Sequence, residues 1–361
     1  MLYAVIMRFD SLREISTSMQ AEARKLSHLG ISMMTSRSTL SDANKRRPQA
    51  VFEAIYRYLY DTYRNRLSSD SRTVKNEPKW MKKLQIIDST TITLFSNLLF
   101  KGVGRHPKTG KKKGGIKVHT VIQANEGVPS DIDFTSAATN DSFMLNPSNF
   151  DRNDIIAFDR AYIDYEKFEQ MTQRGVVYVT KMKKKLKYNI LTDTMYQTPN
   201  GLMEVRIQQV TFTKQLNNKD FITHQARIIT FVDEQKHKLI SLLTNDMESD
   251  PLEIIAIYHK RWEIELLFKQ LKQNFPLKYF YGESANAIKI QIWITLIANL
   301  LLMVMKKGLI RSWSFSGLAT MVRITLMYYV DFYSLFNHPE KDWESTLEAV
   351  SEYTHQLSLF D

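Results

Sequence analysis

The sequence predicts a mixed α/β core that contains a β-rich insertion and lies between helical N-terminal and C-terminal regions. Short apolar runs typical of buried strands begin near residue 84. The apolar residues before and after them have helical spacing, and a second series of short strands follows the first. A chain of 361 residues with 43% hydrophobic and 24% charged residues is large and apolar enough for two or three domains.

Residues 1–80 are expected to be helical. Ser11–Leu29 is amphipathic and ends at Gly30, and residues 35–41 supply capping side chains before the basic residues 45–47. This order is compatible with a helix-turn-helix that binds DNA. A plain helical bundle with a solvated basic face is the alternative.

The core and its insertion are predicted from short strand-like runs separated by turn residues. Three strands in an antiparallel meander are followed by a helix, a strand, a second helix and a strand, which describes a mixed sheet. The expected core strands are 84–88, 116–123, 130–135, 154–159 and 176–180, with helices at 139–150 and 165–174. The insertion strands are 204–212, 226–232 and 238–244.

The last core element is a long helix from residue 250 to about Asn274. Asp250 can cap it, and Pro251 suits its first position. The remainder is helical and apolar, but its longest apolar run, Ile290–Met305, falls short of the roughly 20 residues of a membrane span. We therefore expect a buried helix and no membrane partner. The resulting regions are 1–80 (helical N-terminal), 81–184 (core, first part), 185–248 (β-rich insertion), 249–280 (final core helix) and 281–361 (helical C-terminal).

The composition favours a polyanionic partner. Lys and Arg outnumber Asp and Glu by 49 to 38, which gives a formal charge of +11. A basic surface binds nucleic acid because phosphate contacts release counterions. An anionic membrane and a merely basic soluble protein are the alternatives. The absence of cysteine excludes disulfides, cysteine-ligated zinc and iron–sulfur clusters.

Two acids follow buried strands. Asp88 follows Leu84–Ile87, and Asp159 follows Ile155–Phe158. Two poorly solvated carboxylates side by side repel each other, and a bound divalent cation removes that conflict. Mg²⁺ suits such a site because it takes a few carboxylate oxygens together with substrate phosphate oxygens. Each acid taken alone is better explained as the cap of a following turn.

The long helix carries a polar stripe. Tyr258, Arg261, Glu265 and Lys272 have offsets of 0, 3, 7 and 14, which at about 100° per residue place them within roughly a 60° arc. A carboxylate flanked by two cations and a phenol suits a metal ion beside a phosphate. Glu263 projects to another side of the helix. The alternative is an exposed face with salt links between successive turns.

Together these motifs resemble the DDE transposases of the insertion-sequence-4 family. Asp88-Ser89-Thr90, Asp159-Arg160-Ala161-Tyr162 and the Tyr258–Lys272 stripe are similar to that family's three motif regions. The stripe matches its Tyr-Arg-Glu-Lys signature at every spacing, and the resemblance runs from about Ser11 to Leu309.

The resemblance implies a ribonuclease-H-like core in a bacterial, cytoplasmic, nucleoid-associated enzyme that transposes an insertion sequence by cutting and pasting DNA. Asp88, Asp159 and Glu265 would hold two Mg²⁺ or Mn²⁺ ions. The implied partners are double-stranded DNA and a second copy of the chain in a synaptic homodimer. The residues expected to contact DNA are Tyr258, Arg261, Lys272, Arg160, Tyr162, Lys111, Lys112 and Lys113.

Two lysine-rich segments, residues 101–117 and 181–187, are further candidates for contacts to the DNA backbone, or are solvated loops. Only 87 residues precede Asp88, so the leading alternative is a truncated or domesticated copy that binds DNA without transposing it. A repair or recombination nuclease on the same fold is a third hypothesis.

Overall fold

The structure is a computed structural model that divides into two compact units. One, the helical unit, comprises Met1–Leu67 and Gln270–Asp361; the other, the sheet unit, comprises Ser68–Lys269. The finer division into five regions stays a prediction. The residues described are 1–27, 30–68, 78–93, 115–137, 139–198, 204–215, 221–233, 237–328 and 330–341.

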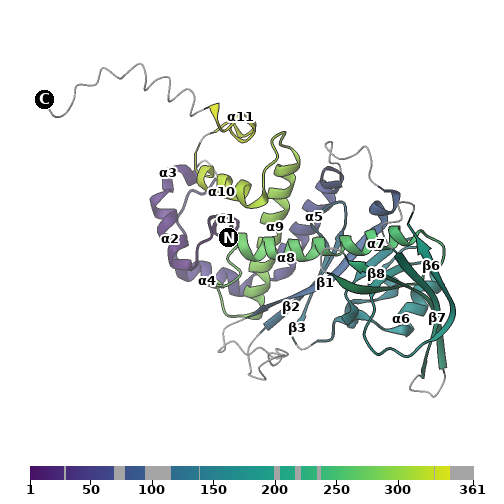
Figure 1. The fold of residues 1–361 in the computed structure, drawn as a ribbon. Helices are drawn as coiled ribbons and strands as arrows, with labels where there is room; N and C mark the ends of the chain where they lie inside the picture. The colour runs from purple at the N-terminus through teal and green to yellow at the C-terminus, as the bar shows by residue number, and fades with distance from the viewer. Residues whose placement is uncertain are drawn as a thin grey trace. The chain divides into compact units, whose positions relative to one another are not determined.

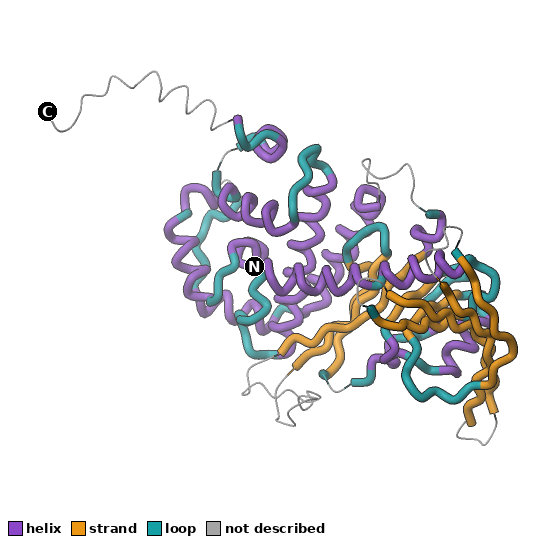
Figure 2. Tube along the Cα trace, in the orientation of Figure 1, coloured by secondary structure: helices purple, strands orange, loops and turns teal. Residues whose placement is uncertain are grey.

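The sheet unit contains a nine-stranded mixed sheet in the order β3-β2-β1-β4-β5-β9-β8-β7-β6 (Figure 2). β1, β2 and β3 form the predicted antiparallel meander, and β4 and β5 run parallel to β1. The strands are β1 (Leu84–Thr93), β2 (Gly115–Gln123), β3 (Pro129–Ser136), β4 (Ile155–Phe158), β5 (Val177–Lys181), β6 (Asn189–Gln197), β7 (Glu204–Gln215), β8 (Phe221–Asp233) and β9 (Lys238–Thr244).

The strands of the predicted insertion extend the core sheet. β9 pairs antiparallel with β5, and β8, β7 and β6 follow it outward. Their pairing therefore satisfies the edge of β5, which would otherwise present unpaired backbone groups to solvent. A sequence pattern predicts the strands but not that the insertion and the core form one sheet, because it does not show which strand edges pair.

The sheet is covered by helices on both faces. α6 (Tyr165–Gln173) packs against β5 and β8, and α7 (Pro251–Lys260) packs against β4 and β5 on the opposite face (Figure 1). Successive side chains of a strand point to opposite faces. Phe158 of β4 and Tyr178 of β5 accordingly join Phe168 of α6 in one buried core cluster.

A buried chain of hydrogen bonds ties the insertion to the core on the α6 face. The hydroxyl of Tyr178 lies 2.7 Å from Nε2 of His224, and Nδ1 of His224 lies 2.9 Å from Glu169 of α6. Tyr178 and His224 are fully buried, so these bonds satisfy groups that would be costly to leave unpaired. β5, β8 and α6 are held together at this point.

Two predicted helices differ from the structure. Residues 139–150 form two short 3-10 helices, Asp141–Met144 and Pro147–Asn149, rather than one connecting helix. Asn140 and Asn146 cap their starts, and a proline at the beginning of the second lacks the N–H that a continuous helix would need. The long helix is also divided, into α7 and α8 (Trp262–Asn274), with Arg261 between them.

The helical unit is built around one buried helix, α9 (Ala285–Lys307), which contacts α1, α4 and α10. α9 is long and apolar enough to cross a membrane, but 78% of its most apolar window is buried inside the protein, as in a core helix. The indole N–H of Trp293 donates to Gln49 at 2.6 Å. The other helices are α1 (Leu2–Met7), α2 (Leu12–Ala21), α3 (Ala23–Leu26), α4 (Arg37–Arg46), α5 (Gln49–Ser68), α10 (Phe315–Thr325) and α11 (Phe332–Asn337).

The N-terminal helices follow the predicted capping residues. Ser11 caps α2 by accepting from the N–H of Glu14, and Ser36 caps α4 by accepting from the N–H of Thr39. The predicted helix Ser11–Leu29 is divided into α2 and α3 at Glu22. α2 and α4 are in contact, which leaves the predicted pair of helices in place.

Candidate active site

Asp88 and Asp159 lie side by side at the end of one parallel ladder. The last residue pair of β1 and β4 is Ile87 with Phe158, and each acid is the next residue on its strand. Neighbouring strands are about 4.8 Å apart, so the carboxylates occupy adjacent positions. By alternation both acids point to the face that carries α7, opposite the α6 core.

The surroundings of Asp88 differ from the prediction in one respect. β1 does not end at Asp88 but continues to Thr93, because Asp88 and the residues after it still pair with β2. Only the pairing with β4 stops there. Asp88 is therefore fixed in a strand on one side and open toward Asp159 on the other, which holds its side chain more rigidly than a loop would.

Burial raises the pKa of Asp88 to about 6. The backbone N–H of Ser89 and the Arg261 guanidinium act in the opposite direction, whereas the nearby carboxylates of Asp159 and Glu265 raise the pKa further. An acid that resists ionisation in the absence of a cation, and whose neighbours are also acids, is characteristic of a functional site.

Asp159 does not act as a helix cap. It precedes the 3-10 helix Arg160–Tyr162, but its side chain accepts no capping hydrogen bond there. The structural alternative considered for this acid is therefore not supported. Its carboxylate lines a cavity and is accessible to a ligand.

Arg261 links the two elements of the site. Its guanidinium lies 3.6 Å from the carboxylate of Asp88 and 2.5 Å from that of Glu265. It also lies over the ring of Tyr258, 5.7 Å from the centroid. The break between α7 and α8 does not separate these side chains, so Tyr258, Arg261 and Glu265 share one face as the spacing predicts.

Glu263 pairs with a different cation from Glu265. Its carboxylate accepts a hydrogen bond from Lys260 at 2.8 Å, one turn away on the helices. This agrees with the helical geometry that favours Glu265 over Glu263.

A cavity of about 610 Å³ opens beside Asp159. Its lining combines cations, a phenol and an indole with two acids, a composition that suits a phosphate-bearing ligand. The lining residues are Asp159, Arg160, Lys181, Asp233, Ile240, Tyr258, His259, Arg261 and Trp262.

The donor chemistry of the site fits a divalent cation. Asp88, Asp159 and Glu265 offer the hard carboxylate oxygens that Mg²⁺ and Mn²⁺ prefer. Across the described ranges no three His, Asp or Glu side chains already converge as a cation site. Arg261, which carries a positive charge, pairs with both Asp88 and Glu265.

The other predicted residues are distributed differently. Arg160 lines the cavity, but Tyr162 is only 1% exposed within the core cluster and offers no surface to DNA. Lys272 lies about two turns beyond Glu265 on α8, in the part of that helix assigned to the helical unit. Lys111, Lys112 and Lys113 lie outside the described residues.

Sequence reasoning did not single out five of the residues that line the cavity, Lys181, Asp233, Ile240, His259 and Trp262. His259 and Trp262 directly follow the signature residues Tyr258 and Arg261, so they lie beside them in the chain. Lys181 was grouped with the lysines that follow it. The available signal was its position at the end of the parallel strand β5.

Comparison with protein families identifies the family of this part of the chain. The family model for "Transposase DDE domain" matches residues 79–301, more than half of the chain. The chain belongs to the transposase DDE domain family. Transposases of this family act on DNA and generally use divalent metal ions. Residues 1–32 also match a domain of unknown function, DUF4372.

Curated relatives carry transposase names. A Sinorhizobium fredii protein, "Putative transposase y4zB", is 28% identical over 263 residues, 73% of this chain and 69% of the relative. A Synechocystis protein, "Putative transposase for insertion sequence element IS4SA", is 27% identical over 296 residues, 81% of this chain and 77% of the relative.

Among solved structures, a piggyBac transposase synaptic complex with hairpin DNA is similar at a TM-score of 0.40 and 9% identity. The similarity covers 68% of this chain and 52% of that one. A score at this level is too low to establish a shared fold.

Proposed function

We propose that this chain is a Mg²⁺-dependent transposase of the insertion-sequence-4 family that cleaves DNA at transposon ends and joins them to a target. Mn²⁺ is the alternative ion, and two ions would be bound. The proposal includes a ribonuclease-H-like core, which the antiparallel β3-β2-β1 meander followed by parallel β4 and β5 supports.

The observation that carries the proposal is the adjacency of Asp88 and Asp159 across β1 and β4, with Arg261 joining Asp88 to Glu265. Two acids from distant parts of the sequence, Asp88 and Glu265, thus share one guanidinium, and Asp159 is the neighbour of Asp88 across the sheet. Burial also raises the pKa of Asp88 to about 6, and perturbed acids of this kind cluster at functional sites.

The residues would divide the chemistry as follows. Asp88, Asp159 and Glu265 would hold the divalent ions, which when bound supply Lewis-acid stabilisation of the charge that develops at a DNA phosphate. Arg261 would bind a phosphate oxygen pair through its planar guanidinium. Tyr258, whose ring Arg261 covers, would fix the direction of that guanidinium.

Phosphate binding would change the partners of Arg261. In the structure its guanidinium pairs with both Asp88 and Glu265. A DNA phosphate that takes this guanidinium leaves both carboxylates with uncompensated negative charge, which increases their demand for a cation. Substrate and metal binding would therefore favour each other.

Several wider features are part of the proposal. The N-terminal helices α2 and α4 would form a DNA-binding helix-turn-helix. Lys272 and Arg160 would add phosphate contacts, and two copies of the chain would assemble on the DNA. The expected setting is the nucleoid of a bacterial cytoplasm.

The test is cleavage of a duplex that carries the element's terminal repeat, with and without Mg²⁺. Wild type should cut it, whereas Asp88→Asn, Asp159→Asn and Glu265→Gln should reduce cleavage to background. Glu263→Gln is the matched control, because it removes a carboxylate from the same helix but outside the site. Equal cleavage by the Glu265 and Glu263 variants would refute the assignment.

The alternatives predict other results. A truncated or domesticated copy would bind the duplex but leave it uncut in wild type and variants alike. A repair or recombination nuclease would cut a matched duplex that lacks the terminal repeat at the same rate as one that carries it.

A further inference from the structure

Lys181 continues the row of charged residues that begins with Asp88 and Asp159. β4 and β5 are parallel, and their last pair is Phe158 with Thr180. The next residues on the two strands are Asp159 and Lys181. Three adjacent strands thus present an acid, an acid and a lysine at the same level of the sheet, on the face that carries α7.

Lys181 is one of the residues that line the cavity of the candidate site. Lys181 is half-buried and lines the cavity together with Asp159, Tyr258 and Arg261. Among the described residues, its side chain forms no salt bridge and no hydrogen bond. A cation placed in a cavity without a protein partner is available to an anionic ligand.

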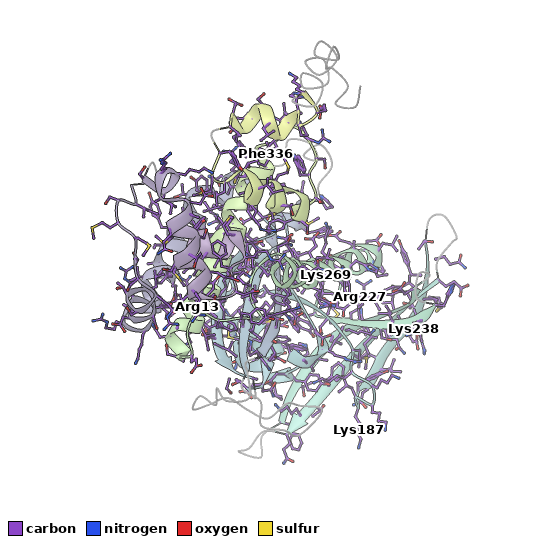
Figure 3. The ribbon with its side chains drawn as sticks, turned by 90° about the vertical axis from the view of Figure 1, so that its left-hand side faces the viewer. Arg13, Lys187, Arg227, Lys238, Lys269 and Phe336 are labelled. Atoms are coloured by element: carbon purple, nitrogen blue, oxygen red, sulfur yellow. The ribbon has the colours of Figure 1, made fainter. Side chains whose placement is uncertain are left out.

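The other lysines of the same run are not part of this cavity. Lys183, Lys184, Lys185 and Lys187 follow on the connection from β5 to β6 and do not line it. Lys187 lies at the lower edge of the sheet in Figure 3, far from Lys269 of α8. Position at the end of β5, and not membership of a lysine run, distinguishes Lys181.

We infer that Lys181 binds a DNA phosphate next to the one that is cleaved, on the side of Asp159 away from Asp88. The inference rests on the proposed function, because it takes the acid pair as the cleavage centre. Successive phosphates of a strand are spaced by several ångströms, so a cation one strand beyond Asp159 meets a neighbouring phosphate rather than the reacting one. Lys181 would act as a point charge that sets the register of the strand.

The test measures DNA binding in Ca²⁺, with the full chain and a short duplex carrying the element's end. Lys181→Met should reduce the dependence of log Kd on log salt concentration by about one phosphate contact. Lys181→Arg should retain the slope. Lys82→Met is the matched control, because Lys82 is an exposed lysine next to the opposite end of β1.

A second measurement identifies the phosphate. Each phosphate near the cleavage site is replaced singly by an uncharged methylphosphonate, and the effect on Kd is compared in wild type and Lys181→Met. A methylphosphonate at one position should weaken DNA binding by wild type but not by Lys181→Met. The contact between Lys181 and that phosphate is already absent in the variant, so removing the phosphate charge costs it nothing further. If Lys181 had only a structural role, the effects of Lys181→Met and of the methylphosphonate on the binding free energy would be additive at every position.

The outcomes separate this inference from the proposed function. Equal salt slopes for Lys181→Met and Lys82→Met, with no coupled phosphate, would overturn the role of Lys181 even if the protein cleaves DNA. Failure of wild type to cleave would refute the proposed function, while the binding measurements would still decide whether Lys181 contacts a phosphate.

Discussion

Replacing Asp88 by Asn should stabilise the protein in the absence of metal ions. The raised pKa means that the folded state binds a proton at Asp88 more tightly than the unfolded state does. Stability contributed by this group is therefore present below pH 3.8, the ordinary pKa, and is lost as the pH rises through about 6. Asn resembles the protonated acid, so the Asp88→Asn variant keeps this stability as the pH rises.

The pKa difference sets the size of the effect. The pKa of Asp88 rises from 3.8 to about 6. A difference of about two pH units corresponds to about 3 kcal/mol at a pH above both values. The side chain of Asp88 is only 19% exposed, so solvent screens little of this electrostatic free energy. The variant also weakens the 3.6 Å contact with Arg261, which reduces the gain. We expect a net gain of about 2 kcal/mol near pH 8 and none near pH 3.

Urea unfolding across this pH range, in the presence of a chelator, measures the gain. Adding Mg²⁺ near pH 8 should stabilise wild type more than Asp88→Asn, because the variant has lost a ligand. Glu263→Gln serves as the control and should show no comparable pH dependence. The reasoning fails if Asp88→Asn is less stable than wild type by the same amount at every pH, since that would indicate an ordinary structural role.

Three further perturbations test other parts of the structure. Arg261→Gln removes the cation between Asp88 and Glu265, so the pKa of Asp88 should rise above 6. An NMR titration of the Asp88 carboxyl resonance measures this pKa, and an unchanged titration would contradict the bridging role of Arg261. His224→Phe leaves the buried hydroxyl of Tyr178 and the half-buried carboxylate of Glu169 without these hydrogen bonds and should cost about 1–3 kcal/mol in urea unfolding. A neutral result would show that these hydrogen bonds are not needed for stability. Trp293→Phe loses the hydrogen bond to Gln49 and part of a buried ring, and should lower the midpoint of thermal unfolding; an unchanged midpoint would argue against a structural role.

Local sequence patterns predicted where the helices and strands lie better than where they end. The strand periodicity located β1, β4 and β5, because buried strands need apolar runs whatever surrounds them. It ended β1 at Asp88, however, since only the partner strand β2 shows that the chain continues in pairing. The sequence also did not predict the division of the long helix at Arg261, because the helical spacing assumes a constant rotation per residue.

The order of the strands was decided by tertiary structure alone. β9 lies beside β5 although β6, β7 and β8 separate them in sequence, and this joins the insertion to the core in one sheet. Backbone hydrogen bonding is non-specific in sequence, so which edges pair depends on packing against helices such as α6. The buried Tyr178–His224–Glu169 chain depends on the same arrangement.

The sequence by itself determined the chemical identities and spacing of the site: two acids behind apolar runs, and Tyr258, Arg261 and Glu265 on one helical face. Only the tertiary structure decided that Asp88 and Asp159 are neighbours, that Arg261 bridges Asp88 to Glu265, and that Tyr162 is buried. It also brought Lys181 into the cavity. The physical reason is that helical and strand periodicity are local, whereas adjacency across a parallel sheet depends on strands that are far apart in the chain.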